Sequence, residues 1–274
     1  MANLVKIAVF TAALLIGHSI ECASAESQST GTLVELETPL ASSHPLAGYL
    51  RRPNREGPLP AVVLLHSCNS NWRHTDERWG KRIASWGYVT LSVDSFGARG
   101  IKGSCKERPS SDFASDAYRA LNFLIQHPAV DPTRVAAIGY SMGGLFVLAS
   151  VERGAVEQAA SNKFRAAVAF YPPCRTLSGN MTVPTLILIG ERDDLNSADD
   201  CRDLAAGRDG WGISRENDRG IPIKLIVYPG AYHAFDAPTP KRPEGHHFEF
   251  NQSTTDQSID ALQEFLGGNL RGDP

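Results

Sequence analysis

Gly139-Tyr140-Ser141-Met142-Gly143-Gly144 is the stretch of this chain that decides its fold. The apolar run before it, 134–138, predicts a buried strand, and the run after it, 145–151, predicts a helix. Glycines on both sides let the backbone turn sharply from strand to helix at Ser141. The serine hydroxyl would then project at the carboxyl end of the strand. Backbone N–H groups at the helix start would face the place where an oxyanion forms.

The pattern G-x-S-x-G has limited specificity when it is taken alone. At average glycine and serine usage, a chain of this length would contain it by chance roughly 0.1 times. The alternative is a glycine-rich turn whose serine takes no part in chemistry. The strand and helix patterns that flank the motif favour a nucleophile, and so do the residues that follow it in the chain.

Apolar runs alternate with helical patterns along most of the chain. Strands are expected at 33–40, 46–52, 61–65, 88–93, 134–138, 166–171, 185–189 and 223–228, and helices at 78–86, 113–124, 145–151 and 259–266. The last helix is expected to stop at Gly267-Gly268. Polar loops are expected at 205–220 and 236–255. This alternation predicts an α/β fold with a mostly parallel central sheet and helices on both faces.

Candidate catalytic partners follow two later strands. In such a sheet, ligands bind beyond the carboxyl ends of the strands. Asp193 follows the strand 185–189, and His233 follows the strand 223–228. The order Ser141, Asp193, His233 is that of nucleophile, acid and base in the α/β-hydrolase fold. Imidazole can take the serine proton during attack, and a carboxylate behind it fixes its tautomer.

Other residues compete for these roles. Asp194 is adjacent to Asp193, and we interpret it as a solvated turn residue. Asp236 lies only three residues beyond His233, so it is not the first choice for the acid. His246-His247 are neighbours in a polar loop, where adjacent side chains do not usually converge on one metal. No metal or cofactor is therefore predicted.

An oxyanion hole needs two backbone N–H donors. Met142, directly after the nucleophile, should supply one. The other should come from the loop after the first parallel strand, 66–71, in which Cys68 is the best candidate.

The first 25 residues differ in composition from the rest of the chain. Lys6 precedes an apolar run over 7–17, and Ala23-Ser24-Ala25 follows as an A-x-A sequence. This order is typical of a secretory signal peptide that is cleaved after Ala25. The apolar run is too short for a stable membrane anchor. We therefore expect a periplasmic or secreted protein in which residues 26–274 form a single domain.

Composition narrows the function classes. The 274 residues are 42% hydrophobic and carry a formal net charge of −3. Such a chain can bury a large core, and no Lys/Arg cluster indicates a nucleic-acid surface. The expected partner is a small molecule, and the sequence leaves the oligomeric state open.

Four cysteines remain after residue 25: Cys68, Cys105, Cys174 and Cys201. An even number in an oxidising compartment indicates disulfides. Three pairings are possible. We favour Cys68–Cys105 and Cys174–Cys201, because each pair joins loops on the same side of the predicted sheet. The alternative is four buried free thiols.

Taken together, these motifs resemble those of the dienelactone hydrolase family. The resemblance covers roughly residues 45–268 and rests on His66-Ser67-Cys68, 94–100, 130–135, the stretch around Ser141, 190–194 and 232–235. It implies an α/β-hydrolase fold and hydrolysis of esters or lactones. Two departures favour a more general serine esterase. The family's well-known members have cysteine where this chain has Ser141, and 234–240 lacks the carboxylate-binding arginine that they carry. Arg99 is then the candidate substrate-binding arginine.

The function expected from the sequence is hydrolysis of a small carboxylic ester or lactone through an acyl-enzyme. A peptidase or an acyltransferase could use the same triad. A catalytically inactive binding protein of the same fold is a third possibility, but the triad in this sequence is complete.

Overall fold

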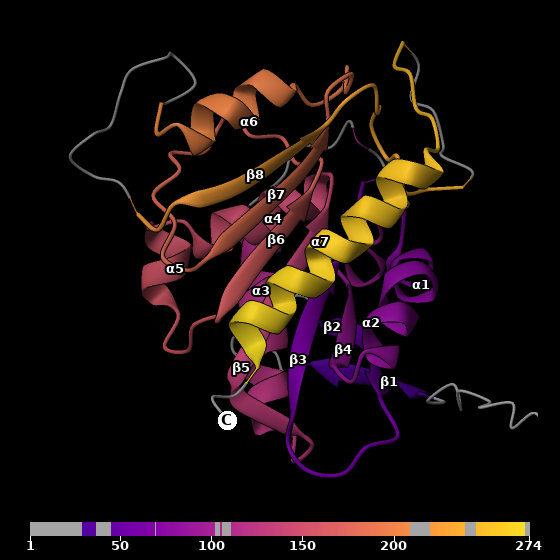
Figure 1. Ribbon diagram of the computed structural model, residues 1–274. Helices are drawn as coiled ribbons and strands as arrows, with labels where there is room; N and C mark the ends of the chain where they lie inside the picture. Colours follow the sequence, from indigo (N-terminus) through magenta and orange to yellow (C-terminus); the bar gives the residue numbers. More distant parts are fainter. Residues whose placement is uncertain are drawn as a thin grey trace, which may run out of the picture.

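A sheet of eight strands runs through the centre of the computed structural model (Figure 1). The structure describes residues 29–36, 45–68, 70–101, 105, 111–208, 220–238 and 245–271. The predicted signal peptide, 1–25, lies outside these residues. In the described part, the strand order is β1-β2-β4-β3-β5-β6-β7-β8.

The strands and helices have the following bounds. The strands are β1 (Thr30–Leu36), β2 (Leu46–Arg52), β3 (Leu59–Leu65), β4 (Val89–Asp94), β5 (Val130–Tyr140), β6 (Ala166–Phe170), β7 (Thr185–Gly190) and β8 (Ile223–Tyr228). The α-helices are α1 (Trp72–Thr75), α2 (Lys81–Ser85), α3 (Ser111–Gln126), α4 (Met142–Val151), α5 (Ala155–Ala159), α6 (Ala198–Ala205) and α7 (Gln252–Leu270), with a π-helical turn η1 (Asp76–Gly80) and a 3-10 turn η2 (Gly97–Arg99).

Six of the strands lie parallel. β1 pairs with β2 and β2 with β4 in antiparallel fashion, whereas β4, β3, β5, β6, β7 and β8 are parallel neighbours. β5 is central, and its Ile138 pairs with Leu64 of β3 and Val168 of β6. All three side chains are fully buried. The carboxyl ends of β3, β5, β7 and β8 therefore open onto one edge of the sheet.

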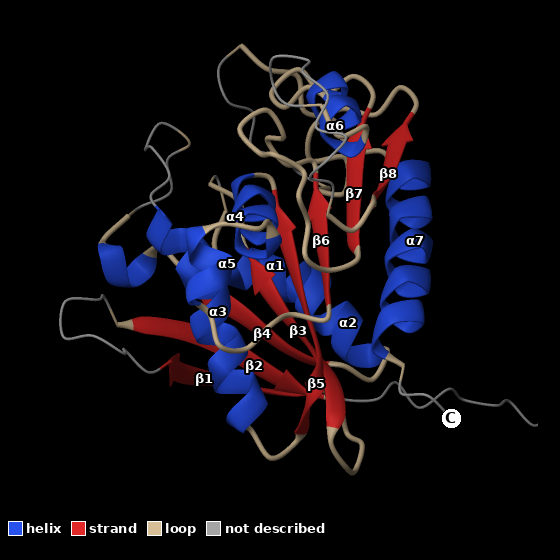
Figure 2. Ribbon diagram, turned by 90° about the vertical axis from the view of Figure 1, so that its left-hand side faces the viewer, coloured by secondary structure: helices blue, strands red, loops and turns tan. Residues whose placement is uncertain are grey.

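Helices cover both faces of this sheet. α3 and α4 pack on one face, and α2 and α7 lie on the other (Figures 1 and 2). Ala117, Leu121 and Leu124 of α3 are fully buried, as their helical spacing predicts. This arrangement confirms the predicted α/β-hydrolase architecture.

The first helical segment is longer than its sequence pattern predicted. It was expected at 78–86, but α1, η1 and α2 form a continuous helical run from Trp72 to Ser85. Asn71 starts the run, because its side-chain oxygen accepts the His74 backbone N–H at 3.3 Å. The buried Asp76 of η1 then forms an ion pair with Arg51 of β2. The Asn71 cap and the Arg51–Asp76 ion pair thus stabilise helix before residue 78, where the apolar periodicity of the sequence is weak.

The prediction for the end of α7 was wrong. The helix continues through Gly267 and Gly268 to Leu270. Each glycine costs roughly 1 kcal/mol relative to alanine in a helix. Burying Leu270, which is fully inaccessible, returns about 1.5–3 kcal/mol. The start was missed too: Asn251 caps the helix by accepting the Thr254 backbone N–H at 2.9 Å, inside the predicted loop 236–255.

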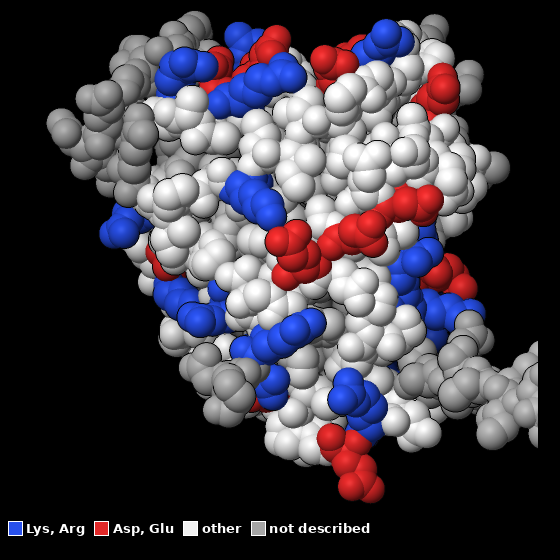
Figure 3. Space-filling model, viewed as in Figure 1, with Lys and Arg blue, Asp and Glu red and all other residues white. Residues whose placement is uncertain are grey.

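The outer side of α7 carries an acidic row. Asp256, Asp260 and Glu264 are exposed at intervals of four residues, and Figure 3 shows acidic side chains aligned across this face among separate Lys and Arg side chains.

The sequence pattern did not predict α6 and α5. α6 begins where the Ser197 hydroxyl accepts the Asp199 backbone N–H at 3.1 Å. No helix in the described part of the chain is both long and apolar enough to cross a bilayer.

Candidate active site

Ser141 sits at the turn between β5 and α4. Its φ of 53° and ψ of −117° are strained for a residue with a side chain. The neighbouring glycines make this turn possible. A Cβ on Gly139 would lie 2.1 Å from the Gly143 carbonyl oxygen, and one on Gly143 would lie 2.3 Å from the Leu65 carbonyl oxygen. The Ser141 N–H donates to the Phe170 carbonyl at 2.9 Å, which ties the turn to β6.

His233 lies between Ser141 and Asp193. Its Nε2 is 3.1 Å from the Ser141 Oγ, and its Nδ1 is 2.7 Å from the Asp193 Oδ2. All three residues are buried. Because a carboxylate oxygen accepts, the Nδ1 carries the proton and the Nε2 lone pair faces the hydroxyl. The arrangement can draw a proton from Ser141 during attack on a carbonyl carbon.

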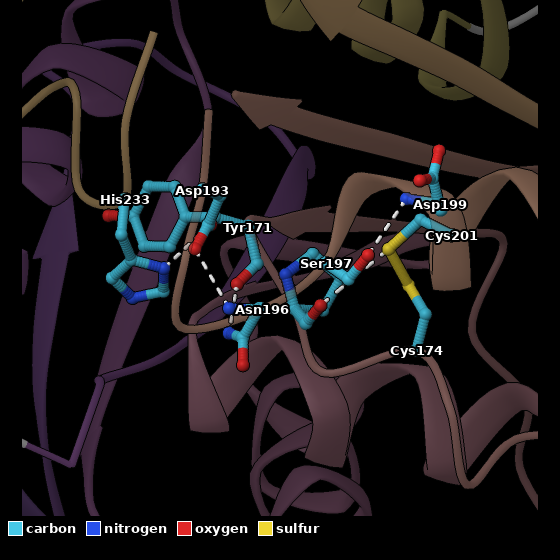
Figure 4. Close-up of a disulfide and its surroundings, with 9 residues drawn as sticks. Tyr171, Cys174, Asp193, Asn196, Ser197, Asp199, Cys201 and His233 are labelled. Carbon is cyan, nitrogen blue, oxygen red and sulfur yellow. Dashed lines mark hydrogen bonds and ion pairs between the residues drawn. A yellow bond between two sulfur atoms is a disulfide. The ribbon is translucent and has the colours of Figure 1, made fainter. Parts of the chain in front are cut away.

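The Asp193 carboxylate is oriented by its own loop. Its Oδ1 accepts the backbone N–H groups of Leu195 at 3.1 Å and Asn196 at 2.8 Å, which leaves Oδ2 for the imidazole. The Asn196 side chain donates to the Tyr171 carbonyl at 2.7 Å. Figure 4 shows Asp193 between the His233 ring and the Asn196 backbone, with the Cys174–Cys201 bridge farther along the same segment.

Two of these residues, Ser141 and His233, line a cavity of about 180 Å³, whereas Asp193 contacts the Nδ1 side of His233. Cys68, Tyr140 and Leu195 are among the other residues that line it. Met142 is the first residue of α4, so its N–H has no acceptor within the helix. Both residues predicted for the oxyanion hole thus lie beside the serine, Cys68 in the cavity wall and Met142 next to it in the chain.

A model of the dienelactone hydrolase family matches residues 46–269. The chain belongs to this family. It is 30% identical to Esterase FrsA of Klebsiella pneumoniae over 113 residues, which are 41% of this chain and 27% of FrsA. It is 32% identical to Lipase 1 of Moraxella sp. (strain TA144) over 142 residues, which are 50% of this chain and 39% of that lipase. The matches therefore span less than half of these relatives.

A solved structure shows the same fold. It is that of a dienelactone hydrolase-like promiscuous phosphotriesterase from metagenomic libraries, with a TM-score of 0.68 and 20% sequence identity. The superposition covers 89% of this chain and 99% of that one. The predicted fold and the predicted dienelactone hydrolase resemblance are confirmed.

In this member of the family, the two competing carboxylates lie elsewhere. Asp194 accepts the His247 backbone N–H at 3.0 and 3.2 Å, and His246 lies beside it. The Asp236 side chain is fully buried. It accepts the Trp79 Nε1–H at 2.7 Å and the Tyr171 hydroxyl at 2.8 Å. Neither carboxylate reaches the imidazole.

Asp236 has a cation at 3.3 Å, the guanidinium of Arg78 from η1. Burial, and then the Asp236 charge, raises the pKa of Tyr171 well above its ordinary value, so the hydroxyl stays protonated and donates. The Tyr171 ring also meets the His233 ring edge-on, with the ring centroids 4.7 Å apart. The Phe248 ring, from the segment before α7, lies against the His233 ring at the same centroid distance. Sequence reasoning missed this cluster, because its members come from separate elements.

The expected substrate role of Arg99 is not supported by its position. Its guanidinium donates to both oxygens of the buried Asp116 at 2.7 and 3.0 Å and to the Ser95 carbonyl at 2.6 Å. It also lies over the Phe113 ring. A buried carboxylate needs such a partner, so Arg99 is held in the structure. Among the described residues, the arginine that lines the cavity of Ser141 is Arg78.

Two disulfides join the four cysteines of the described chain. Cys68 is bonded to Cys105, and Cys174 to Cys201, which is the pairing that the sequence favoured. The first bridge lines the cavity beside Ser141. The second joins the loop after β6 to α6. The free-thiol alternative does not describe this structure.

Proposed function

We propose that this protein is a serine carboxylesterase that hydrolyses small esters or lactones through an acyl-enzyme. The observation that carries the proposal is the position of His233 in the wall of a cavity, within hydrogen-bond distance of both Ser141 and Asp193. The esterase and lipase relatives support the reaction class.

In the proposed mechanism, the Ser141 Oγ attacks the ester carbonyl carbon while His233 Nε2 accepts its proton. The carbonyl oxygen becomes an oxyanion that accepts hydrogen bonds from the backbone N–H groups of Met142 and Cys68. Collapse breaks the ester bond, and His233 gives its proton to the departing alcohol. Water then attacks the acyl-enzyme, with its proton passing to His233 and back to Ser141, which releases the acid. Asp193 holds the imidazole in the required tautomer throughout.

The cavity favours a small acyl group. A volume of about 180 Å³ matches a short acyl chain. Activity on p-nitrophenyl esters should therefore be highest for acetate to butyrate and fall for octanoate. A burst of p-nitrophenol with one equivalent per enzyme would report the acyl-enzyme.

The direct test replaces the nucleophile. Ser141→Ala should lose turnover on the order of 10³-fold or more, and a fluorophosphonate probe should label the native protein at Ser141. A wild-type protein that neither labels nor turns over esters would overturn the proposal. Parallel assays with peptide amides and with a second alcohol as acceptor would reveal a peptidase or an acyltransferase.

The proposal includes export to the periplasm or the medium. It is supported by the signal-like residues 1–25 and by the two disulfides, which persist in oxidising compartments. Expression of the full chain in a bacterial host should give a mature protein that begins at Glu26. A cytoplasmic protein that keeps its first residues would contradict export and leave the catalytic proposal in place.

A further inference from the structure

His66 is a buried histidine that the mechanism above does not use. It follows β3 directly and is only 4% exposed. Its ring meets Phe96 edge-on, with the centroids 4.5 Å apart. Its Nδ1 lies 3.0 Å from the carbonyl oxygen of the next residue, Ser67. The imidazole is therefore fixed on both an aromatic ring and the backbone of the loop that precedes Cys68.

The Ser67 carbonyl determines which nitrogen of His66 carries the proton. A carbonyl oxygen only accepts, so Nδ1 is the N–H donor in this pair. Burial lowers the pKa of His66, which outweighs the opposite influence of the Ser67 carbonyl and of the Asp94 and Asp116 charges. Its Nε2 has no hydrogen-bond partner among the described residues. His66 is thus a neutral ring with a single working donor.

The same peptide unit contains the Cys68 N–H. In a trans peptide, the C=O of Ser67 and the N–H of Cys68 point in opposite directions, and none of the peptide bonds in the described chain is cis. The Ser67 oxygen also accepts the Ser70 N–H at 3.2 Å. Two donors on the carbonyl therefore fix the plane of the peptide. The direction of the Cys68 N–H follows from that plane.

The Cys68 N–H is the group that this peptide plane would direct at a substrate. No described residue accepts a hydrogen bond from it, and Cys68 lines the cavity of Ser141. The start of α4 is held against the same loop, because Gly143 approaches the carbonyls of Leu65 and His66 so closely that a Cβ would lie 2.3 and 2.6 Å from them. Met142 and Cys68 are thereby kept near each other.

We propose that His66 is a positioning residue for the oxyanion hole, whose Nδ1–H holds the Ser67 carbonyl so that the Cys68 N–H is aimed at the developing oxyanion. This inference rests on the proposed function. It predicts that loss of the Nδ1 donor raises the barrier of the chemical step while substrate binding stays nearly unchanged. Removing an oxyanion donor outright costs about 10²–10³-fold in turnover, and a misaligned donor should cost about 10–10²-fold.

Two variants separate donor position from side-chain size. The amide nitrogen of asparagine can occupy the place of Nδ1, whereas that of glutamine reaches the place of Nε2. We expect His66→Gln and His66→Ala to lose about 10–10²-fold in kcat with less than a threefold change in KM, and His66→Asn to recover most of the loss. Circular dichroism and the melting temperature would identify any variant that fails to fold, and the comparison of His66→Asn with His66→Gln holds even if His66→Ala is lost.

A tetrahedral inhibitor gives a second measurement. An alkyl boronic acid adds to the serine oxygen and places an oxygen in the oxyanion hole, so its inhibition constant should rise in His66→Gln by about the factor lost in kcat. Full kcat in His66→Ala, or equal losses in the Asn and Gln variants, would overturn the inference. The wild-type burst and its fluorophosphonate labelling are measured on the same preparations. Their failure would instead overturn the proposed function itself.

Discussion

Adjacent side chains at the end of β7 show how one turn separates two roles. Asp193 and Asp194 follow each other in the chain, yet the first is buried against His233 and the second lies at the surface beside His247. Backbone hydrogen bonds determine which of the two carboxylates faces the imidazole. The N–H groups of Leu195 and Asn196 fold back onto Asp193 Oδ1, and this turn directs Oδ2 at the imidazole. The sequence offered both carboxylates, and the strand-end offset favoured Asp193.

This difference predicts unequal effects of two matched substitutions. Asp193→Asn should reduce kcat by about 10²–10⁴-fold, because an amide can donate to Nδ1 and favour the tautomer that cannot accept the serine proton. Asp194→Asn is the control and should change kcat less than threefold. The measurement is steady-state hydrolysis of p-nitrophenyl acetate, with thermal melts of both variants. Equal, small losses would remove Asp193 from the triad.

At the scale of elements, the buried Asp236 is a junction, meaning a side chain that bonds to several separate segments of the fold. It joins Trp79 of η1, Tyr171 at the end of β6 and the loop that carries His233, and Arg78 supplies the counter-charge. A buried carboxylate with two neutral donors and one cation is well satisfied. Removing its charge would leave the guanidinium without its partner, and breaking such a pair costs more than the pair contributes.

We therefore expect Asp236→Asn to lower the free energy of unfolding by about 3 kcal/mol, near the lower limit for a broken buried pair, because Arg78 is partly exposed. Urea denaturation of the two proteins provides the measurement. Asp260→Asn, on the exposed side of α7, serves as the control and should change the free energy by less than about 0.5 kcal/mol. A loss in Asp236→Asn no greater than that of the control would show that the junction contributes no stability.

For the whole molecule, local patterns predicted what local forces determine. The strand–turn–helix around Ser141, the mostly parallel sheet and the places of Asp193 and His233 all follow from short stretches of sequence. The junction at Asp236 does not, because its bonds to Trp79 and Tyr171 span 157 and 65 residues. Such contacts leave no periodic signal. The end of α7 was mispredicted for a related reason, since the tertiary burial of Leu270 offsets the local cost of two glycines in a helix.

The two disulfides are consistent with the oxidising compartment proposed for the protein. They should differ in how easily they are reduced. Cys105 is exposed, whereas Cys174 and Cys201 are buried at 2% and 0%. Thiolate attack requires access to a sulfur atom. Mild dithiothreitol without denaturant should therefore open Cys68–Cys105 first. Each bridge should contribute about 2–4 kcal/mol to stability, so the protein should stay folded after this first step.

Activity should fall with this first reduction, because Cys68 carries the proposed oxyanion donor and would lose the bond that anchors its loop. We expect kcat to decrease with little change in KM, in proportion to the alkylation of Cys68 and Cys105 measured by mass spectrometry over time. A sample with alkylating agent alone is the control. Earlier labelling of Cys174 and Cys201 would contradict the accessibility argument. Unchanged kcat after complete labelling of Cys68 would show that the backbone of the loop holds the donor without the bridge.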